Sequence, residues 1–489
     1  MREWFPTVAV EDRGAGVLWG AQLAWAGSWE MEVFRRDDCA GLSGGLADRE
    51  FGHWGKRLAP GEILKAPTAW LACVRGDIDD LCHRFVAVQE RVAIEQAPAV
   101  ERDLPIAFNE YCQTWGKPTH DKLVALADRL RGSGVRYLVI DAGWYTNTGG
   151  WGGHGSWEVD RTAFPQGLAA TAAAIRERGL VPGLWFEMET VDQGSQPFGE
   201  LDHLLKRDGV PITVGSRRFW DLRDPWVRDF LDQRVIGRLR DDGFGYLKVD
   251  YNETIGLGCD GVESPGEGLR QHVLAIHDLF RRIRREIPEL VIENCASGGH
   301  RLEPSMMALA SQASFSDAHE LVEIPIVAAN LHRLIAPRQS QIWAVLHAGD
   351  DARRMRYVLA STFLGRLCLS GDLASLASAQ WELVREAIAV YRDAAAVIGH
   401  GFSRRYGPQL DSWRHPQGWQ AVVRHDAGQA LVVAHAFADA PRLLRVPLPP
   451  GSWRVAQRFA NPSTEVCGDA LEIAVEGDFS AAVVLLRQA

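Results

Sequence analysis

The chain has 489 residues, 46% hydrophobic and 24% charged, which is long enough for several globular domains. A formal net charge of −10, without a basic block, argues against nucleic acid as a partner. No run of about 18 apolar residues is present to span a membrane, so no membrane partner is expected. The first residues lack the pattern of a secretion signal, and eight scattered cysteines without a CxxC pair indicate reduced thiols. We therefore expect a cytoplasmic protein.

Residues 1–98 are predicted to form an N-terminal antiparallel β domain that ends in a linker helix. Three segments rich in β-branched and aromatic residues, with turn residues between them, are the expected strands: 15–24, 28–36 and 62–74. Residues 76–92 have the apolar spacing of a helix, and Asp77 is a candidate cap.

Residues 99–400 show short apolar runs that alternate with amphipathic helices, a pattern typical of parallel strands joined by crossover helices. Eight runs are candidate strands: 106–112, 137–144, 181–190, 246–253, 290–299, 311–320, 341–349 and 364–373. Eight such units over about 290 residues predict a (β/α)8 TIM barrel within an α/β fold. An open, doubly wound sheet is the alternative, because the pattern alone does not show closure.

Residues 401–489 lose the helical pattern that precedes them. Apolar, β-branched segments separated by Gly, Pro, Asn and Asp predict a C-terminal antiparallel β-sandwich. Fifteen histidines without the spacing of metal ligands, and the absence of glycine-rich nucleotide motifs, predict neither a metal nor a cofactor.

Polar residues at the ends of the barrel strands are the candidates for catalysis, because TIM barrels carry their active sites there. The candidates, several of them acids, are Asn109, Asp141, Glu187, Glu189, Lys248, Asp250, Asn252, Glu293, Asn294 and Asp317. A sugar hydrolase needs two carboxylates, one to attack the anomeric carbon or activate water and one to protonate the leaving oxygen.

The segment LKVDYN is the sharpest motif, because strand alternation places Lys248, Asp250 and Asn252 on one face. A lysine beside Asp250 would keep this carboxylate ionised, as a nucleophile requires. The alternative is a structural ion pair at a strand end. For Asp317, in SFSDAHE, the alternative is a helix N-cap.

Two further motifs fit sugar binding. In IDAGW, Asp141 would bond to sugar hydroxyls while Trp144 packs against a ring face; alternatively, Asp141 is buried and pairs with backbone amides. In NCASGG, small residues would let a ligand approach the backbone, or the glycines simply shape the loop.

Six motifs, taken in order, resemble the melibiase-type α-galactosidases, a family of retaining glycoside hydrolases that also holds raffinose and stachyose synthases. They are Asn109, IDAGW (140–144), GLWFEME (183–189), KVDYN (248–252), ENCASGGHR (293–301) and FSD (315–317). The resemblance implies a barrel between β domains, no cofactor and a possible homo-oligomer. It also implies that Asp250 is the catalytic nucleophile and Asp317 the acid/base.

The remaining roles are likewise implied by the resemblance. Lys248 and Asn252 would contact sugar hydroxyls, Trp185 would form a wall of the subsite, and Arg301 matches the arginine after the loop. Cys295, Ser297 and Gly298 would lie near the C2 and C3 hydroxyls.

Three departures from the family pattern bear on the substrate. Many members read D-D-G-W, with both aspartates binding O4 and O6 of galactose, whereas Ala142 stands at the second position here. The usual P-E is Met188-Glu189, and the N-terminal domain is shortened to about 95 residues, which matches the last part of the family's domain. We therefore expect a retaining α-glycosidase that acts on α-galactosides.

The alternatives are the same mechanism on a β-L-arabinopyranoside or an α-N-acetylgalactosaminide, transglycosylation, or a carbohydrate-binding protein with a decayed site. A neighbouring acid that fills the gap at Ala142 would preserve ordinary galactosidase specificity.

Overall fold

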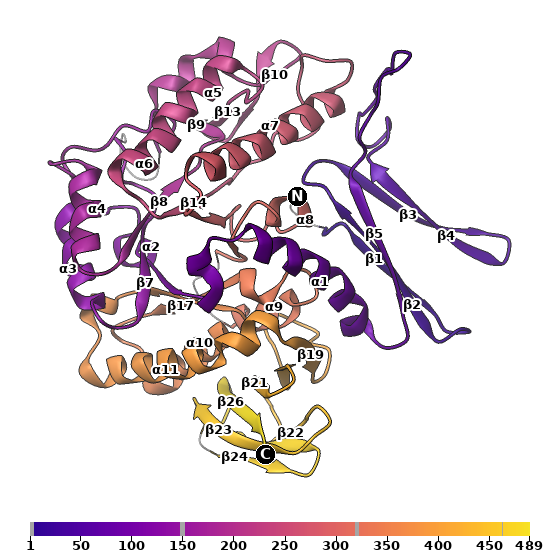
Figure 1. The fold of residues 1–489 in the computed structure, drawn as a ribbon, viewed down its shortest axis with the longest axis vertical. Coiled ribbons are helices and arrows are strands. Elements are labelled where there is room, and N and C mark those ends of the chain that lie inside the picture. The colour runs from indigo at the N-terminus through magenta and orange to yellow at the C-terminus, as the bar shows by residue number, and fades with distance from the viewer. Residues whose placement is uncertain (1–3, 147–151, 318–321, 462) are drawn as a thin grey trace.

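The computed structural model describes residues 4–146, 152–317, 322–461 and 463–489. Its centre is a closed barrel of eight parallel strands in chain order (Figure 1). The strands are β6 (Ile106–Asn109), β7 (Val135–Ile140), β8 (Val181–Phe186), β14 (Tyr246–Val249), β15 (Val291–Asn294), β16 (Gln312–Ser314), β17 (Ser340–Leu346) and β18 (Arg366–Gly371). Each strand overlaps one of the eight predicted runs. The closed barrel confirms the predicted fold class and rules out the open doubly wound sheet.

Helices surround the barrel, and local sequence explains where several of them begin. Thr119 caps α3 by accepting a hydrogen bond from the Lys122 amide, and Ser264 caps α7 in the same way, with Pro265 in the first turn. The helices on and around the barrel are α2 (Tyr111–Thr114), α3 (His120–Leu130), α4 (Leu168–Glu177), α5 (Pro225–Leu231), α6 (Arg238–Asp242), α7 (Pro265–Glu286), α8 (Pro304–Met307), α9 (Ile324–Leu331), α10 (Ala352–Ser361) and α11 (Ser378–His400).

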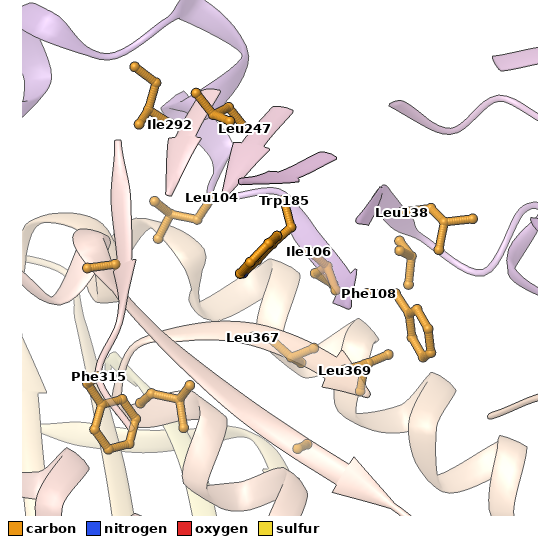
Figure 2. Close-up of a cluster of buried hydrophobic side chains, with 14 of the residues drawn as sticks. Leu104, Ile106, Phe108, Leu138, Trp185, Leu247, Ile292, Phe315, Leu367 and Leu369 are labelled. Atoms are coloured by element: carbon orange, nitrogen blue, oxygen red, sulfur yellow. The ribbon is translucent and has the colours of Figure 1, made fainter. Parts of the chain in front are cut away.

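The side chains of each barrel strand alternate between two cores. One set packs with the surrounding helices, and Figure 2 shows members from several strands: Phe108, Leu138, Leu247, Ile292 and Leu367. The other set fills the barrel interior, where residues of non-adjacent strands meet. The rings of Tyr137 and Tyr246 lie 5.0 Å apart, and the Gln341 amide donates to the Tyr246 hydroxyl at 3.0 Å. Alternation therefore decides which strand-end residues point into the mouth of the barrel.

The N-terminal region contains two small antiparallel sheets and a helix. One sheet joins β1 (Thr7–Asp12), β2 (Val17–Ala24) and β5 (Thr68–Val74), and the other is the hairpin of β3 (Trp29–Arg36) and β4 (Cys39–Leu46). Helix α1 (Ile78–Gln96) begins with the predicted cap, since Asp77 accepts hydrogen bonds from the amides of Asp79 and Asp80. The hairpin extends away from the barrel (Figure 1). Strands β1 and β4 were not predicted.

The C-terminal region is a pair of antiparallel sheets that pack on an apolar core of their own. The larger sheet has the order β19 (Phe402–Tyr406), β20 (Trp419–His425), β21 (Gln429–Ala436), β26 (Ser480–Gln488) and β23 (Trp453–Phe459). The smaller sheet has the order β22 (Leu443–Pro447), β25 (Ala470–Ala474) and β24 (Thr464–Cys467). Divisions of the chain at 98/99 and 400/401 stay predictions. No helix within the described ranges is long and apolar enough to cross a membrane.

A small β insertion follows strand β8, in a stretch to which the sequence analysis assigned no element. Strands β12 (Thr213–Val214) and β13 (Arg217–Phe219) pair with each other, and β13 pairs with β9 (Thr190–Asp192). A second short pair, β10 (Lys206–Arg207) and β11 (Val210–Pro211), lies beside them in the chain. The insertion brings Arg217 to the mouth of the barrel, which no strand-end pattern could have predicted.

Candidate active site

Asp250 follows strand β14 and accepts four hydrogen bonds within the barrel mouth. The amides of Tyr251 and Ser297 donate to Oδ1 at 2.8 and 3.2 Å. The Asn252 amide and the Trp185 indole donate to Oδ2 at 2.9 and 3.2 Å. Ser297 has a positive φ of 49°, a backbone conformation that is uncommon outside glycine. Donors on both oxygens stabilise the ionised carboxylate.

Asp141, at the end of β7, is the partner of Lys248. The Lys248 Nζ lies 2.8 Å from Asp141 Oδ2, and the Asn109 amide donates to the same oxygen at 2.7 Å. Burial alone would lower the pKa of Lys248, but the Asp141 carboxylate raises it well above its ordinary value. The sequence placed Lys248 beside Asp250; in the structure its hydrogen bond goes to Asp141, on the far side of strand β8, and Asp250 is one of the further carboxylates whose charge raises the pKa of Lys248.

The interpretation of Asp141 as a buried residue that pairs with backbone amides also applies in part. The Ala142 amide donates to Asp141 Oδ1 at 2.8 Å, while the Asp141 amide donates to Glu110 at 2.9 Å. Burial raises the pKa of Glu110 to about 8, so this carboxyl group is neutral at pH 7. Ala142 itself packs in the main apolar cluster. Asp141 is therefore the carboxylate that bonds to Lys248, with the neutral acid Glu110 behind it.

Asn252 links Asp250 to Glu187, a buried acid that the sequence analysis named as a strand-end candidate without giving it a role. Its amide donates to Glu187 at 2.8 Å as well as to Asp250, and Arg217 donates to Glu187 at 2.7 and 3.2 Å. Burial favours the neutral acid, but the charge and hydrogen bonds of the Arg217 guanidinium hold the pKa of Glu187 below its ordinary value. Glu187 directly follows β8, where the strand-end pattern had placed it; Arg217, on the short strand β13, could not have been found this way.

Asp317 lies beyond the end of β16, where its side chain opens into the barrel mouth. The surrounding protein atoms and the negative charge of Asp250 together raise the pKa of Asp317 to about 6. The glycines of the NCASGG loop hold this segment. A Cβ on Gly298, whose φ is 80°, would lie 2.3 Å from the Asp317 amide nitrogen, and one on Gly299 would lie 2.3 Å from the Phe315 oxygen. Gly298 and Gly299 therefore leave room for the backbone of the segment that carries Asp317. Residues 318–320 of the SFSDAHE motif lie outside the described residues.

Two of the predicted wall residues have different environments. Trp185 donates to Asp250 and stacks on Tyr145 with ring centroids 6.0 Å apart. Trp144 is 0% exposed, stacks on Trp157, and donates from its indole to the Trp185 carbonyl at 2.8 Å. The prediction that Trp144 packs against a sugar ring is therefore corrected: it supports Trp185 from behind.

Cys295 and Arg301 are both buried beside the nucleophile segment. Burial and the charge of Asp250 raise the pKa of the Cys295 thiol well above its ordinary value, so the thiol stays protonated. The Arg301 guanidinium bonds to Glu189 at 2.5 and 2.9 Å and lies 3.6 Å from the centre of the Tyr251 ring. Glu189, from the unusual Met188-Glu189 pair, thus neutralises Arg301.

The arrangement defines a class of site: two carboxylates at the carboxyl end of a TIM barrel, one hydrogen-bonded on both oxygens and one with a raised pKa. Residues 65–401 match the model of the Melibiase family. This match covers more than half of the chain, and the chain therefore belongs to the melibiase family.

Curated relatives and solved structures agree with this assignment. The chain is 26% identical over 429 residues to alpha-galactosidase 2 of Pediococcus pentosaceus, covering 85% of this chain and 58% of that protein. It is 25% identical over 334 residues to an alpha-galactosidase of Escherichia coli, covering 66% of this chain and 45% of that protein. The chain thus spans about half of the length of these relatives.

The fold is shared with GH36 alpha-galactosidase AgaB from Geobacillus stearothermophilus, with a TM-score of 0.82 at 20% identity. That alignment covers 99% of this chain and 69% of the AgaB chain. The galactosidase domain of the alpha-galactosidase-sucrose kinase AgaSK has a TM-score of 0.82 at 19% identity, covering 99% of this chain and 68% of that one.

Proposed function

We propose that this protein is a retaining α-glycosidase that hydrolyses terminal α-galactosides, with Asp250 as nucleophile and Asp317 as general acid/base. The observation that carries the proposal is the contrast between the two carboxylates. Four N–H donors favour the charged form of Asp250, whereas Asp317 has a pKa of about 6. A nucleophile must be ionised, while an acid must hold a proton near neutral pH.

The two groups divide a double displacement between them. Asp250 attacks the anomeric carbon while Asp317 gives its proton to the glycosidic oxygen, which leaves with the aglycone. The Asp317 carboxylate then takes a proton from water, and the resulting hydroxide displaces Asp250 from the sugar. Two inversions at one carbon return the original α configuration.

The relatives support the choice of substrate. The curated relatives from Pediococcus pentosaceus, Geobacillus stearothermophilus and Escherichia coli are named as α-galactosidases. Solved structures of variants of AgaA from Geobacillus stearothermophilus hold stachyose and raffinose. We infer an oligosaccharide or another glycoside with a terminal α-galactosyl group as the substrate of this chain.

Product stereochemistry and azide rescue test the mechanism. The wild-type enzyme should release α-galactose first, as seen by proton NMR within the first turnovers. Asp250→Ala should lose at least about 10⁴-fold in kcat, and azide should then give a β-galactosyl azide after a single inversion. Asp317→Ala with azide should give the α-azide, because azide replaces water at the second step.

Asp202→Ala is the matched control, since Asp202 is an exposed acid outside the barrel mouth and its loss should leave kcat unchanged. Release of β-galactose by the wild type would overturn the retaining mechanism. An Asp250→Ala variant that keeps a tenth of the wild-type rate would remove Asp250 as nucleophile. Binding of galactosides without any turnover would favour a carbohydrate-binding protein instead.

Ala142 favours a second candidate, the same mechanism on a galactose-like sugar altered at C6, such as a β-L-arabinopyranoside. A second carboxylate at this position would bond to O4 and O6, and charge-assisted hydrogen bonds contribute about 1.5–3 kcal/mol each. Ala142→Asp should raise kcat/KM on nitrophenyl α-galactoside and lower it on the arabinopyranoside. A strong wild-type preference for galactoside, unchanged in the variant, would show that another group fills the gap. Nitrophenyl α-N-acetylgalactosaminide and a sugar acceptor in the same screen test the remaining substrates and transglycosylation.

A further inference from the structure

A cavity of about 830 Å³ lies between the N-terminal region and the barrel, outside the catalytic centre. Trp29, at the start of β3, and Phe51, after β4, line one side. On the barrel side lie His272 of α7, Tyr251 and Arg301. In Figure 1, the β3–β4 hairpin belongs to the N-terminal sheets and α7 to the helices around the barrel. Small-molecule sites typically occupy about 300–1,000 Å³, so this cavity has the volume of a binding site.

Hydrogen bonds between the two parts hold the walls of the cavity in place. The Trp54 indole donates to Glu267 at 3.0 Å. The Gly55 amide donates to the Ser264 hydroxyl at 3.0 Å, and that hydroxyl donates to the Gly55 carbonyl at 2.8 Å. The amide of Gly266 adds a bond to the carbonyl of His53 at 3.0 Å. The cavity is therefore a built feature of the interface between sheet and barrel.

His272 is the polar group that this cavity leaves without a partner. It is 2% exposed, and neither ring nitrogen has a hydrogen-bond partner among the described residues. Burial lowers the pKa of His272 to about 3, so the ring is neutral and offers one donor and one acceptor. A buried polar group without partners costs free energy of folding, which a ligand with matching groups recovers on binding.

The charges around the cavity favour a neutral ligand. Arg301 is already neutralised by Glu189 at 2.5 Å, and the carboxylates of Glu30 and Glu32 also line the space and repel anions. A hydroxyl group, which both donates and accepts, is the natural partner of a neutral imidazole. The rings of Trp29 and Phe51 supply apolar surface beside these polar groups.

We propose that this cavity is a second, non-catalytic carbohydrate site, which binds a neutral oligosaccharide of two or three sugar units. It is separate from the catalytic centre because Tyr251 and Arg301 line it, whereas Asp141, Asp250 and Asp317 do not. The Tyr251 ring, covered by Arg301 at 3.6 Å, forms the partition between the two spaces. A bound sugar would thus contact the residue next to the nucleophile without reaching the nucleophile itself.

Binding measurements on the full chain test this site independently of the hydrolysis mechanism. The Asp250→Ala variant, saturated with galactose to fill the catalytic site, is titrated with raffinose by calorimetry. We expect one further binding event per chain. Adding Phe51→Ala should weaken this event by about fivefold or more, and adding His272→Phe should weaken it to a similar degree.

Trp413→Ala is the matched control, because Trp413 is an exposed aromatic residue of the C-terminal region and does not line the cavity. It should leave the raffinose titration unchanged. Raffinose binding that survives both cavity substitutions, or no second event at all, would overturn the proposal. So would binding of tetramethylammonium in place of sugar, which would mark an aromatic cation cage. Loss of hydrolysis without loss of the second event would refute only the proposed function.

Discussion

The barrel mouth and the cavity beside α7 use similar side chains but differ in how their polar groups are satisfied. In the mouth, Asp141, Asp250 and Glu187 each bond to several donors within the protein. In the cavity, His272 has no partner among the described residues, although it is equally buried. The mouth is therefore pre-organised before a substrate arrives, whereas the cavity leaves the hydrogen bonds of His272 to a ligand.

The largest effect is expected where a paired charge of the mouth is removed. Lys248→Met should leave the buried Asp141 carboxylate without its counter-charge, lowering the free energy of unfolding by about 3–5 kcal/mol. It should also lower kcat/KM by about 10²-fold or more through misplacement of the site. Urea denaturation and hydrolysis of nitrophenyl α-galactoside measure both. Lys206→Met, at an exposed ion pair of 3.8 Å, should cost less than about 1 kcal/mol. Equal losses of unfolding free energy in Lys248→Met and Lys206→Met would contradict a structural role for the buried Lys248–Asp141 pair.

A smaller effect is expected from disturbing the backbone that holds Asp317. Gly298→Ala should push the segment away, because its Cβ would lie 2.3 Å from the Asp317 amide nitrogen, and kcat should fall by about 10²-fold. Gly179→Ala is a close control, since Gly179 has a φ of 81° but nothing within 4 Å of the added Cβ. It should cost about 1–2 kcal/mol in stability and leave kcat unchanged. If both variants had a similar kcat, Gly298 would not be needed to position Asp317.

The pH dependence of activity should report the raised pKa of Asp317. The general acid must carry a proton, so kcat/KM should fall as the pH rises above about 6, approaching tenfold per pH unit. This fall, the alkaline limb of the pH profile, should be weak for a dinitrophenyl glycoside, whose leaving group needs little protonation. Asp317→Asn should remove the limb altogether. A limb that persists in Asp317→Asn would assign the titration to another group.

The smallest effect, and one of opposite sign, is expected in the cavity. His272→Phe removes two unsatisfied nitrogens and keeps a ring of similar shape, so the free energy of unfolding should stay the same or rise by about 1–3 kcal/mol. His203→Phe is the contrasting case, since His203 bonds to Asp224 at 2.7 Å, and it should be destabilising. Thermal melting of both variants without ligand makes the comparison. A strong loss of stability in His272→Phe would indicate that the imidazole has a partner within the protein.

The barrel strands could be predicted because each one carries its own evidence. A buried parallel strand needs a short apolar run, and its carboxyl end shows where the run stops, as in YLKV before Asp250. Capping is equally local, and Asp77 caps α1 as predicted. Strand β4, which is rich in glycine and mostly exposed, lacks such a pattern, which explains why it was not predicted.

The pairing of the site residues depended on the tertiary structure. Sequence alone indicated that Lys248, Asp250 and Asn252 share one face, and the family motifs selected Asp250 and Asp317. The strand order decided that Lys248 bonds to Asp141, because β7 and β14 both pair with β8, and the two side chains meet there with Nζ 2.8 Å from Oδ2. Strand periodicity fixes the direction of a side chain but not its partner across the barrel. For the same reason, the burial of Trp144 and the cavity around His272, which arise from contacts between distant segments, were decided only by the fold.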